Sequence, residues 1–368
     1  MTTTVAPAPP RGRSRTGSIH RGEGTAGWLF VLPIVVILGI FLFIPVLMAL
    51  WVSFSDWTGR GSPLAGNVRF VGLDNYAKIT TAGGLQTRDF GIALRNNAWY
   101  VVLVVPLQTA LSLLLAVLVS RRMLRARGFF RTAFYFPSVT SSVAITVLWM
   151  FLFSFAGPVN QLLSWVGLHG PNWFQDPRGI LNLALGGGSG PAWLADGQFL
   201  GVSWWDWLAG PSIAMFALIL MAVFTTSGTF MLLFIAALQN VGYELTEAGM
   251  MDGASGWQRF WRITLPQLRP TLFTVITLGL IGCWQVFDQI YTGTQGGPGK
   301  TTVTPAYLSY TAAFTQQEWG QGAAIAFILF LIIIVFTIFQ RWVLRERTVS
   351  RRRMRAYLPR TTPKKGRP

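Results

Sequence analysis

The stretch Gly27–Ser53, GWLFVLPIVVILGIFLFIPVLMALWVS, runs for 27 residues without a charged side chain. A helix needs about 20 apolar residues to cross the hydrocarbon core of a bilayer. Inside that core an unpaired backbone N–H or C=O has no water to bond, so a single spanning segment must be helical. The stretch therefore predicts a transmembrane helix over residues 27–53.

Five further apolar segments lead to the same fold class. The whole chain is 52% hydrophobic and only 12% charged, with a mean hydropathy of +0.46, whereas an ordinary soluble domain carries about 25% charged residues. This composition excludes a disordered chain, a coiled coil and most water-soluble enzymes. We therefore expect an all-α membrane protein with six transmembrane helices, the remaining five over residues 97–120, 132–156, 211–240, 271–291 and 322–340.

The distribution of basic residues predicts the orientation of these helices. If the N-terminus is cytoplasmic, the inner segments hold 23 of the 30 Lys and Arg residues and the outer segments hold 7. Cytoplasmic loops carry the excess of positive charge in membrane proteins, so we expect both termini to be cytoplasmic. The tails 1–26 and 346–368 are then basic cytoplasmic segments beside the lipid bilayer, and residues 1–22 are expected to be disordered.

The net charge of +17 does not indicate a nucleic-acid partner. Eleven of the basic residues lie between Arg341 and Arg367, beside an apolar run, where topology and anionic lipid explain them. A basic patch interleaved with aromatic residues, of the kind that binds RNA, is absent from the sequence. We therefore expect no nucleic-acid binding.

Few side chains of this sequence are suited to catalysis or metal binding. The chain has a single cysteine, Cys283, and two histidines, His20 and His169. One cysteine excludes a cysteine-based metal cluster within the chain, and the histidines do not form a catalytic constellation with paired carboxylates. We expect no metal site and no catalytic residues. A membrane-embedded enzyme stays an alternative that turnover by the purified chain would support.

The predicted inner segment 241–270 carries the most informative pattern, YELTEAGMMDGASGWQRFWRITLPQLRP, from Tyr243 to Pro270. Acidic residues at the start of a short helical pattern suit the helix dipole, Gly253 breaks that helix, and a second amphipathic piece follows that Pro266 ends. Two short helices joined at a glycine would form a protrusion able to enter a groove on a soluble partner. The alternative is a helix pair lying on the lipid headgroups.

This stretch resembles the EAA loop of ATP-binding-cassette (ABC) importer permeases, whose pattern is E-A-A, then D-G-A, then I-x-L-P. Gly249 stands in place of the usual second alanine. The resemblance implies the type I ABC importer permease fold and a coupling helix that docks on an ATPase subunit. The residues expected to couple to the ATPase are Glu244, Glu247, Ala248, Asp252, Gly253, Ala254, Ile263, Leu265 and Pro266.

A second pattern follows the fifth apolar segment: FDQIY at 287–291 and TQGGP at 294–298. It is similar to the carbohydrate branch of those permeases, the maltose and glycerol-phosphate type. The resemblance covers roughly residues 28–345 and implies a permease domain over 27–345. The outer segment 157–210 contains an insertion, about 181–210, that exceeds the family pattern.

The resemblance also implies the partners of the chain. These are a second permease subunit related by a pseudo-two-fold axis, two ABC ATPase subunits, an extracytoplasmic sugar-binding protein and a sugar. ATP and Mg²⁺ would bind the ATPase subunits, so no cofactor is expected in this chain. The expected location is a bacterial cell membrane, which the chain crosses several times.

Polar residues near the outer end of the segment 271–291 are candidates for the substrate pathway. Gln285, Asp288 and Gln289 have helical spacing and would share one face, with Trp284 beside them. A sugar is bound by side chains that hydrogen-bond its hydroxyls and by an aromatic ring that stacks on it. A charged residue such as Asp288 within a membrane helix also favours a functional role. The alternative is that Asp288 is hydrated at the outer interface. Ser and Thr clusters at 138–142 and 225–229 are expected to serve mainly helix packing.

The sequence thus predicts a permease subunit of an ATP-driven sugar importer. The principal alternative is a secondary carrier or channel. Such a protein would need no EAA-type loop, and ion coupling usually requires more buried ionisable residues.

Overall fold

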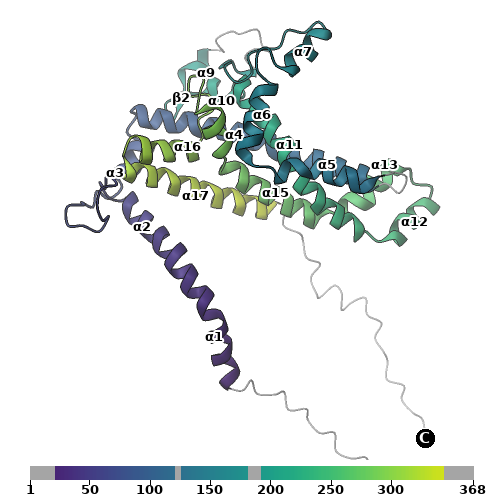
Figure 1. Ribbon diagram of the computed structural model, residues 1–368, viewed down its shortest axis with the longest axis horizontal. Helices are drawn as coiled ribbons and strands as arrows, with labels where there is room; N and C mark the ends of the chain where they lie inside the picture. The colour runs from purple at the N-terminus through teal and green to yellow at the C-terminus, as the bar shows by residue number, and fades with distance from the viewer. Residues whose placement is uncertain (1–20, 121–125, 181–191, 344–368) are drawn as a thin grey trace, which may run out of the picture.

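Figure 1 shows the computed structural model of the chain, which describes residues 21–120, 126–180 and 192–343. The C-terminal tail 346–368 and residues 181–191 of the insertion lie outside the described residues. Of the tail expected over 1–26, residues 1–20 also lie outside them, whereas helix α1 already begins at Arg21.

Helices account for almost all secondary structure in the described residues, and the one two-stranded sheet pairs β1 (Gln198–Phe199) with β2 (Val202–Ser203) in antiparallel register. The helices are α1 (Arg21–Leu38), η1 (Gly39–Phe43), α2 (Ile44–Ser53), α3 (Asp74–Thr80), α4 (Leu85–Ser120), α5 (Arg127–Val139), α6 (Ser142–Leu152), α7 (Pro158–Trp165), α9 (Ala192–Asp196), α10 (Trp204–Leu208), α11 (Ile213–Gln239), α12 (Tyr243–Met251), α13 (Gly256–Arg259), η2 (Phe260–Thr264), α14 (Leu265–Gln267), α15 (Arg269–Trp284), η3 (Ile290–Thr294), α16 (Pro305–Tyr310), η4 (Thr311–Thr315) and α17 (Trp319–Val343).

Four of the described helices are long and apolar enough to cross a membrane: Gly27–Ser53, Leu85–Ser120, Ile213–Gln239 and Trp319–Val343. A fifth candidate arises if α5 and α6, which meet at a bend of 100°, count as one span. Helix α15 is apolar but has only 16 residues. By length and composition the structure therefore supports four to five spans, where the sequence predicted six.

Three of the predicted helices differ from the observed ones. The helix predicted over 97–120 begins twelve residues earlier, at Leu85. The helix predicted over 132–156 is broken, because Thr140 and Ser141 adopt extended backbone between α5 and α6. The helix predicted over 271–291 ends at Trp284, and a short helical piece resumes only at Asp288.

The core lies where α11 packs against α4, α5 and α15. Helix α11 is apolar around its circumference, and its residues Met215, Leu218 and Ile219 are fully buried. A helix that is hydrophobic on all sides is stable only inside a larger body or in lipid. Helix α11 therefore forms the centre around which the other helices are arranged.

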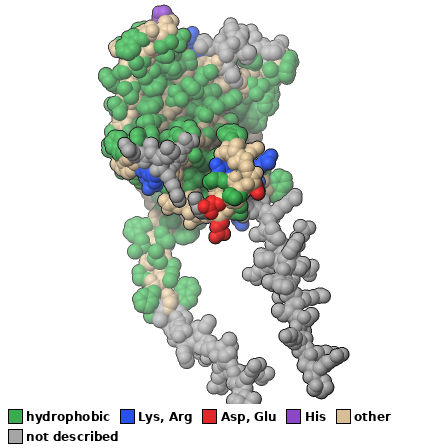
Figure 2. Space-filling model, turned by 90° about the vertical axis from the view of Figure 1, so that its right-hand side faces the viewer, with side chains coloured by type: hydrophobic (Ala, Val, Ile, Leu, Met, Phe, Trp, Pro, Cys, Tyr) green, Lys and Arg blue, Asp and Glu red, His purple; other side chains and the backbone are tan. Residues whose placement is uncertain are grey.

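Helices α1 and α2 leave this body as one continuous apolar helix, which Figure 1 shows diverging from α17. None of the most apolar window of Gly27–Ser53 is buried by the rest of the chain. Green apolar side chains also cover most of the face in Figure 2. Such a surface is unstable in water and is typical of contact with lipid or with another membrane subunit.

Candidate functional site

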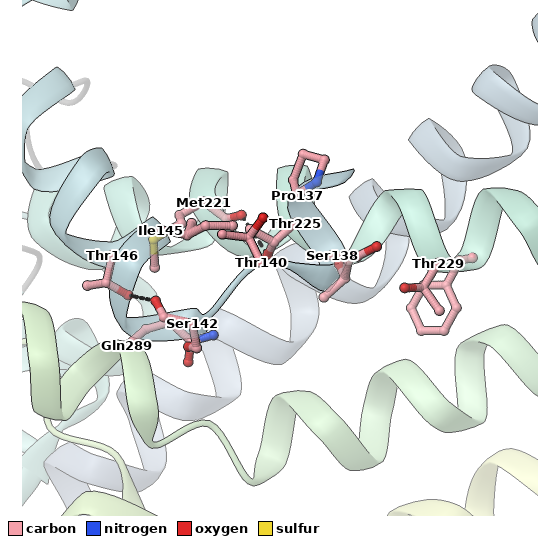
Figure 3. A pocket seen from close by; sticks show the side chains of 12 residues that line it. Pro137, Ser138, Thr140, Ser142, Ile145, Thr146, Met221, Thr225, Thr229 and Gln289 are labelled. Atoms are coloured by element: carbon pink, nitrogen blue, oxygen red, sulfur yellow. Dashed lines mark hydrogen bonds between the residues drawn. The ribbon is translucent and has the colours of Figure 1, made fainter. Parts of the chain in front are cut away.

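A polar cavity of about 300 Å³ opens beside the break between α5 and α6 (Figure 3). The extended backbone of Thr140 and Ser141 separates the two helices there, and α11 closes the other side. A short segment after α15 contributes Gln289. The lining residues are Pro137, Ser138, Thr140, Ser142, Ile145, Thr146, Met221, Thr225, Thr226, Thr229, Phe230 and Gln289.

Most of the polar groups in this lining are hydroxyls. Seven of the lining residues are Ser or Thr, and the described lining contains no ionisable side chain. Ser and Thr in helices commonly donate their hydroxyl hydrogen to a carbonyl three or four residues earlier. Thr146 does so to Ser142 O at 2.8 Å, as Figure 3 shows, and Thr225 does so to Met221 O at 3.0 Å. The hydroxyls of Thr146 and Thr225 are therefore satisfied by their own helices, although these helices are largely apolar.

One wall of the cavity is held by a buried amide. The fully buried Gln108 of α4 accepts a hydrogen bond of 2.6 Å at its Oε1 from the Thr226 hydroxyl of α11. Gly279 of α15 lies against Gln108 Nε2 so closely that a Cβ there would collide with it. This junction joins three helices directly behind the lining residue Thr226.

The structure separates the four residues predicted for the substrate pathway. Gln289 lines the cavity, whereas Gln285 and Asp288 are exposed and are not among its lining residues. Because α15 ends at Trp284, the three polar residues do not share the face of one helix, and that prediction was wrong. Asp288 lies beyond this helix rather than within it.

Trp284 lies in the apolar core. Its side chain is 2% exposed, and its ring lies 5.2 Å from that of Phe336 in α17. Its backbone oxygen accepts a hydrogen bond of 3.0 Å from Asn97 Nδ2. In this conformation the indole packs against protein and does not face the cavity.

The two Ser/Thr clusters were expected to serve mainly helix packing, and the hydroxyls of Ser138, Thr140, Thr225 and Thr226 do donate to backbone oxygens three or four residues earlier. The structure brings members of both clusters together around the cavity. Pro137, which is two residues ahead of the last residue of α5, was the available signal, since a proline weakens helical continuity. The sequence does not show that the two clusters face each other across the break between α5 and α6.

The loop between α11 and α15 forms two short helical arms joined at a turn. Helix α12 ends at Met251, and Gly253 has φ +74°, a left-handed conformation that favours glycine. Ser255 then caps α13 through a capping box with Gln258. The two helices and the glycine between them agree with the pattern of the sequence.

Pro266 does not end the second arm, as the sequence predicted. The chain continues from α13 through η2 into α14, and Leu265, the residue before the proline, still donates its N–H to Phe260 O. The turn comes at Leu268, which is fully buried and precedes α15. Buried Leu268 anchors the base of the loop.

The residues predicted to couple to an ATPase lie together on this loop at one end of the molecule. Glu244, Glu247 and Asp252 are exposed, and Figure 2, which looks onto this end, shows acidic side chains flanked by basic ones. Ala248, Gly253 and Pro266 are also exposed, while Ala254, Ile263 and Leu265 are partly buried and pack within the loop. Exposed Met251 and Trp257 add apolar surface. This mixture is typical of a surface that receives a protein partner.

Comparison with a family model gives a match over residues 108–349, to the binding-protein-dependent transport system inner membrane component. The match covers the cavity and the loop 241–270. It thus includes both regions described above.

Individual relatives match over nearly their whole length. The chain is 30% identical over 334 residues to the lactose transport system permease protein of Rhizobium radiobacter, covering 90% of this chain and 97% of the relative. It is 29% identical over 324 residues to the trehalose/maltose transport system permease protein of Thermococcus litoralis, covering 88% and 95%.

Among solved structures, the fold is similar to a bacterial ABC transporter involved in the import of the acidic polysaccharide alginate. The TM-score is 0.66 at 19% sequence identity, covering 89% of this chain and 97% of that one. A second structure of the alginate transporter, in complex with its oligosaccharide-bound periplasmic protein, gives a TM-score of 0.65 at 18% identity, covering 88% and 95%.

Proposed function

Because the chain belongs to the family of inner membrane components of binding-protein-dependent transport systems, we propose that it forms one half of the translocation pathway of an ATP-driven sugar importer. It is the non-catalytic, multi-pass permease subunit of such a system, and ATP is hydrolysed by partner subunits. The observation that carries the proposal is the full-length similarity to permeases named for lactose and for trehalose/maltose.

The membrane arrangement that we propose has six spans with both termini in the cytoplasm. The four long helices are joined by the bent pair α5–α6 and by α15 with the segment that follows it. The excess of Lys and Arg in the segments between alternate spans supports this orientation. The loop 241–270 then faces the cytoplasm, and the segment 157–210 faces outward.

We propose that α12 docks on an ABC ATPase subunit. Its acidic residues and its exposed Leu245 and Met250 supply charged and apolar contact on one short helix. Buried Leu268 joins this loop to α15, so a displacement of α12 would be transmitted to the transmembrane body. ATP-driven closure of two ATPase subunits would thereby rock this chain against a second permease subunit.

We propose further that the polar cavity beside the α5–α6 break belongs to the substrate pathway. It lies between the bent pair α5–α6, α11 and the segment after α15, and it presents hydroxyls and the Gln289 side chain in otherwise apolar surroundings. Polar groups placed in a mostly apolar concavity are the usual arrangement of a small-molecule site. Gln285 and Asp288, exposed beside Gln289, would extend the pathway once a second permease subunit faces them, and Trp284 would support it from behind.

The experiment that tests the function is purification of the chain from its native membrane with its partners, followed by reconstitution in vesicles. We expect an ATPase, a second permease and a binding protein to copurify. Sugar uptake should require ATP and the binding protein. Uptake that persists without the ATPase subunits would instead favour a secondary carrier or channel.

The docking surface is tested by reversing one charge on α12. Glu247→Lys should release the ATPase subunits from the detergent-solubilised complex and abolish ATP-dependent uptake. The matched control is Glu318→Lys, the same reversal at an exposed glutamate beside the start of α17, at the opposite end of the molecule (Figure 1). Release of the ATPase by the control, or retention by Glu247→Lys, would contradict the assignment of α12.

A further inference from the structure

The hydroxyls of the cavity share a property that bears on what they bind. A hydroxyl has one hydrogen to donate and two lone pairs that accept. Five lining hydroxyls donate their hydrogen to an oxygen of the protein itself. The donations are from Ser138 to Tyr135 O (2.6 Å), Thr140 to Phe136 O (3.0 Å), Thr146 to Ser142 O (2.8 Å), Thr225 to Met221 O (3.0 Å), and Thr226 to Gln108 Oε1 (2.6 Å) or Ala222 O (2.7 Å).

A hydroxyl whose hydrogen is committed to the protein offers a ligand only its lone pairs. The Thr226 hydroxyl has two such protein acceptors within hydrogen-bond distance, Gln108 Oε1 and Ala222 O. Of these, Gln108 Oε1 is fully buried and cannot turn toward water. The wall formed by α5, α6 and α11 is therefore a set of hydrogen-bond acceptors fixed in apolar surroundings.

Donors in the lining are fewer. Ser142 Oγ is buried and has no hydrogen-bond partner among the described residues, and the Gln289 amide adds an N–H₂ group to the lining. The lining residues include no Lys, Arg, His, Asp or Glu. A carboxylate or phosphate placed in the cavity would meet lone pairs and no cation, and burying an unpaired charge is costly.

We propose that this cavity selects a neutral solute rich in hydroxyl groups, which binds by donating hydrogen bonds to the wall, and that it rejects uronic acids and sugar phosphates. The inference rests on the proposed function and narrows its substrate class. A neutral sugar supplies several O–H donors for the hydroxyl oxygens of the wall, and ether or hydroxyl oxygens that can accept from Ser142 and Gln289. Among sugars and their derivatives, the neutral ones match both the excess of hydrogen-bond acceptors in the cavity lining and its lack of charged side chains.

The first test asks whether the transported sugar is neutral or charged. The complete transporter is reconstituted in vesicles, and uptake is measured with its binding protein saturated by each of three probe sets: neutral disaccharides, uronate disaccharides and sugar phosphates. We expect ATP-dependent uptake of neutral probes only. Uptake of a uronate or a sugar phosphate would overturn the inference and leave the proposed function intact. Absence of ATP-dependent uptake for every probe would overturn the proposed function itself.

The second test removes one acceptor. Thr225→Val keeps the shape of the side chain and removes the hydroxyl, so uptake of the transported sugar from saturated binding protein should fall about two- to tenfold, the equivalent of one neutral hydrogen bond. Thr225→Ser, which keeps the acceptor, should restore most of that loss. The control is Thr274→Val, whose hydroxyl donates to Pro270 O in the same way but lies at an exposed position of α15, outside the lining.

Thermal unfolding of the complex and copurification of the ATPase subunits separate substrate contact from folding. Both should match the wild type in all three variants if Thr225 acts by contacting the sugar. Uptake by Thr225→Val equal to the wild type would overturn the inference. A fall of uptake that is accompanied by a lower melting temperature or by loss of the ATPase subunits would also overturn it, since Thr225 would then be a packing residue.

Discussion

At the residue scale, Gly249, which stands where the family pattern has alanine, lies close against the second arm of the loop. A Cβ at this position would lie 2.8 Å from Ile263 Cδ1 and 3.5 Å from Arg259 Cγ. The glycine thus allows α12 to lie close against the second arm of the loop. The nearest atom is the end of a flexible side chain, so a single methyl group can be accommodated by a small shift.

Two substitutions of Gly249 should therefore behave differently. Gly249→Ala gains about 0.8–1 kcal/mol of helix propensity against a small displacement of Ile263, so ATPase retention and thermal stability should equal or exceed those of the wild type. Gly249→Val should cost about 1–3 kcal/mol through overpacking and loosen the loop. Thermal unfolding and ATPase copurification measure both. Identical behaviour of the valine variant and the wild type would contradict the close packing.

Asp176 gives a pH-dependent prediction outside the membrane spans. Its carboxylate accepts hydrogen bonds from the Arg178 guanidinium (2.6–3.1 Å) and from the Arg178 backbone N–H (3.0 Å), and these bonds lower the pKa of Asp176 below its ordinary value. The backbone oxygens of the same two residues accept bonds from Ala214 and Ile213 at the start of α11. By fixing the turn at residues 176–178, the ionised carboxylate helps to hold these backbone oxygens against α11.

Because the pKa of Asp176 is lower in the folded protein than in the unfolded chain, the carboxylate stabilises the fold at any pH above its unfolded-state pKa. This stabilisation is lost as the pH falls through its folded-state pKa. Between about pH 6 and about pH 3, the melting temperature of the wild type should fall more steeply than that of Asp176→Asn. At about pH 6 the variant should be the less stable of the two. Parallel pH profiles would show that the carboxylate contributes nothing to stability.

At the element scale, the contact between α4 and α15 depends on the pair Gln108 and Gly279. Since a Cβ at Gly279 would collide with Gln108 Nε2, Gly279→Ala should destabilise the protein by about 1–3 kcal/mol. The matched control is Gly282→Ala on the same helix, where a Cβ meets nothing within 4 Å. Thermal unfolding in detergent should show a loss for the first variant only.

A double mutant tests whether the collision itself is the cause. Gln108→Ala removes the obstructing amide, so Gly279→Ala should cost less in that background than in the wild type. If the double mutant loses as much stability as the two single mutants together, α4 and α15 do not meet through Gln108 and Gly279.

At the scale of the whole molecule, the proposed topology places α7 and the loop 241–270 on opposite sides of the membrane. Ser164 of α7 and Ser255 of the loop are both exposed serines. In a Cys283→Ala background, Ser164→Cys should react with a membrane-impermeant thiol reagent in intact cells. Ser255→Cys should react only after permeabilisation. Labelling of Ser255→Cys in intact cells would overturn the orientation.

The sequence by itself determined the features that depend only on the residues of one continuous stretch. The length of Gly27–Ser53 and its lack of charge predict a span without reference to any neighbour. The same holds for the loop 241–270, where the glycine that breaks the first short helix is a local signal. The family follows from that loop, since its residue types and spacing are contained in one short stretch.

Only the tertiary structure decided where α15 ends and where the cavity lies. A helix can stop within apolar surroundings only if its freed carbonyls find donors. At this end Trp284 O accepts from Asn97 and Val286 O accepts from Thr304 Oγ1 (3.0 Å), and Asn97 lies 187 residues away in the sequence. No local pattern around 284–289 contains those donors. The separation of Gln289 from Gln285, and the facing of two Ser/Thr clusters across the α5–α6 break, therefore exist only in the folded chain.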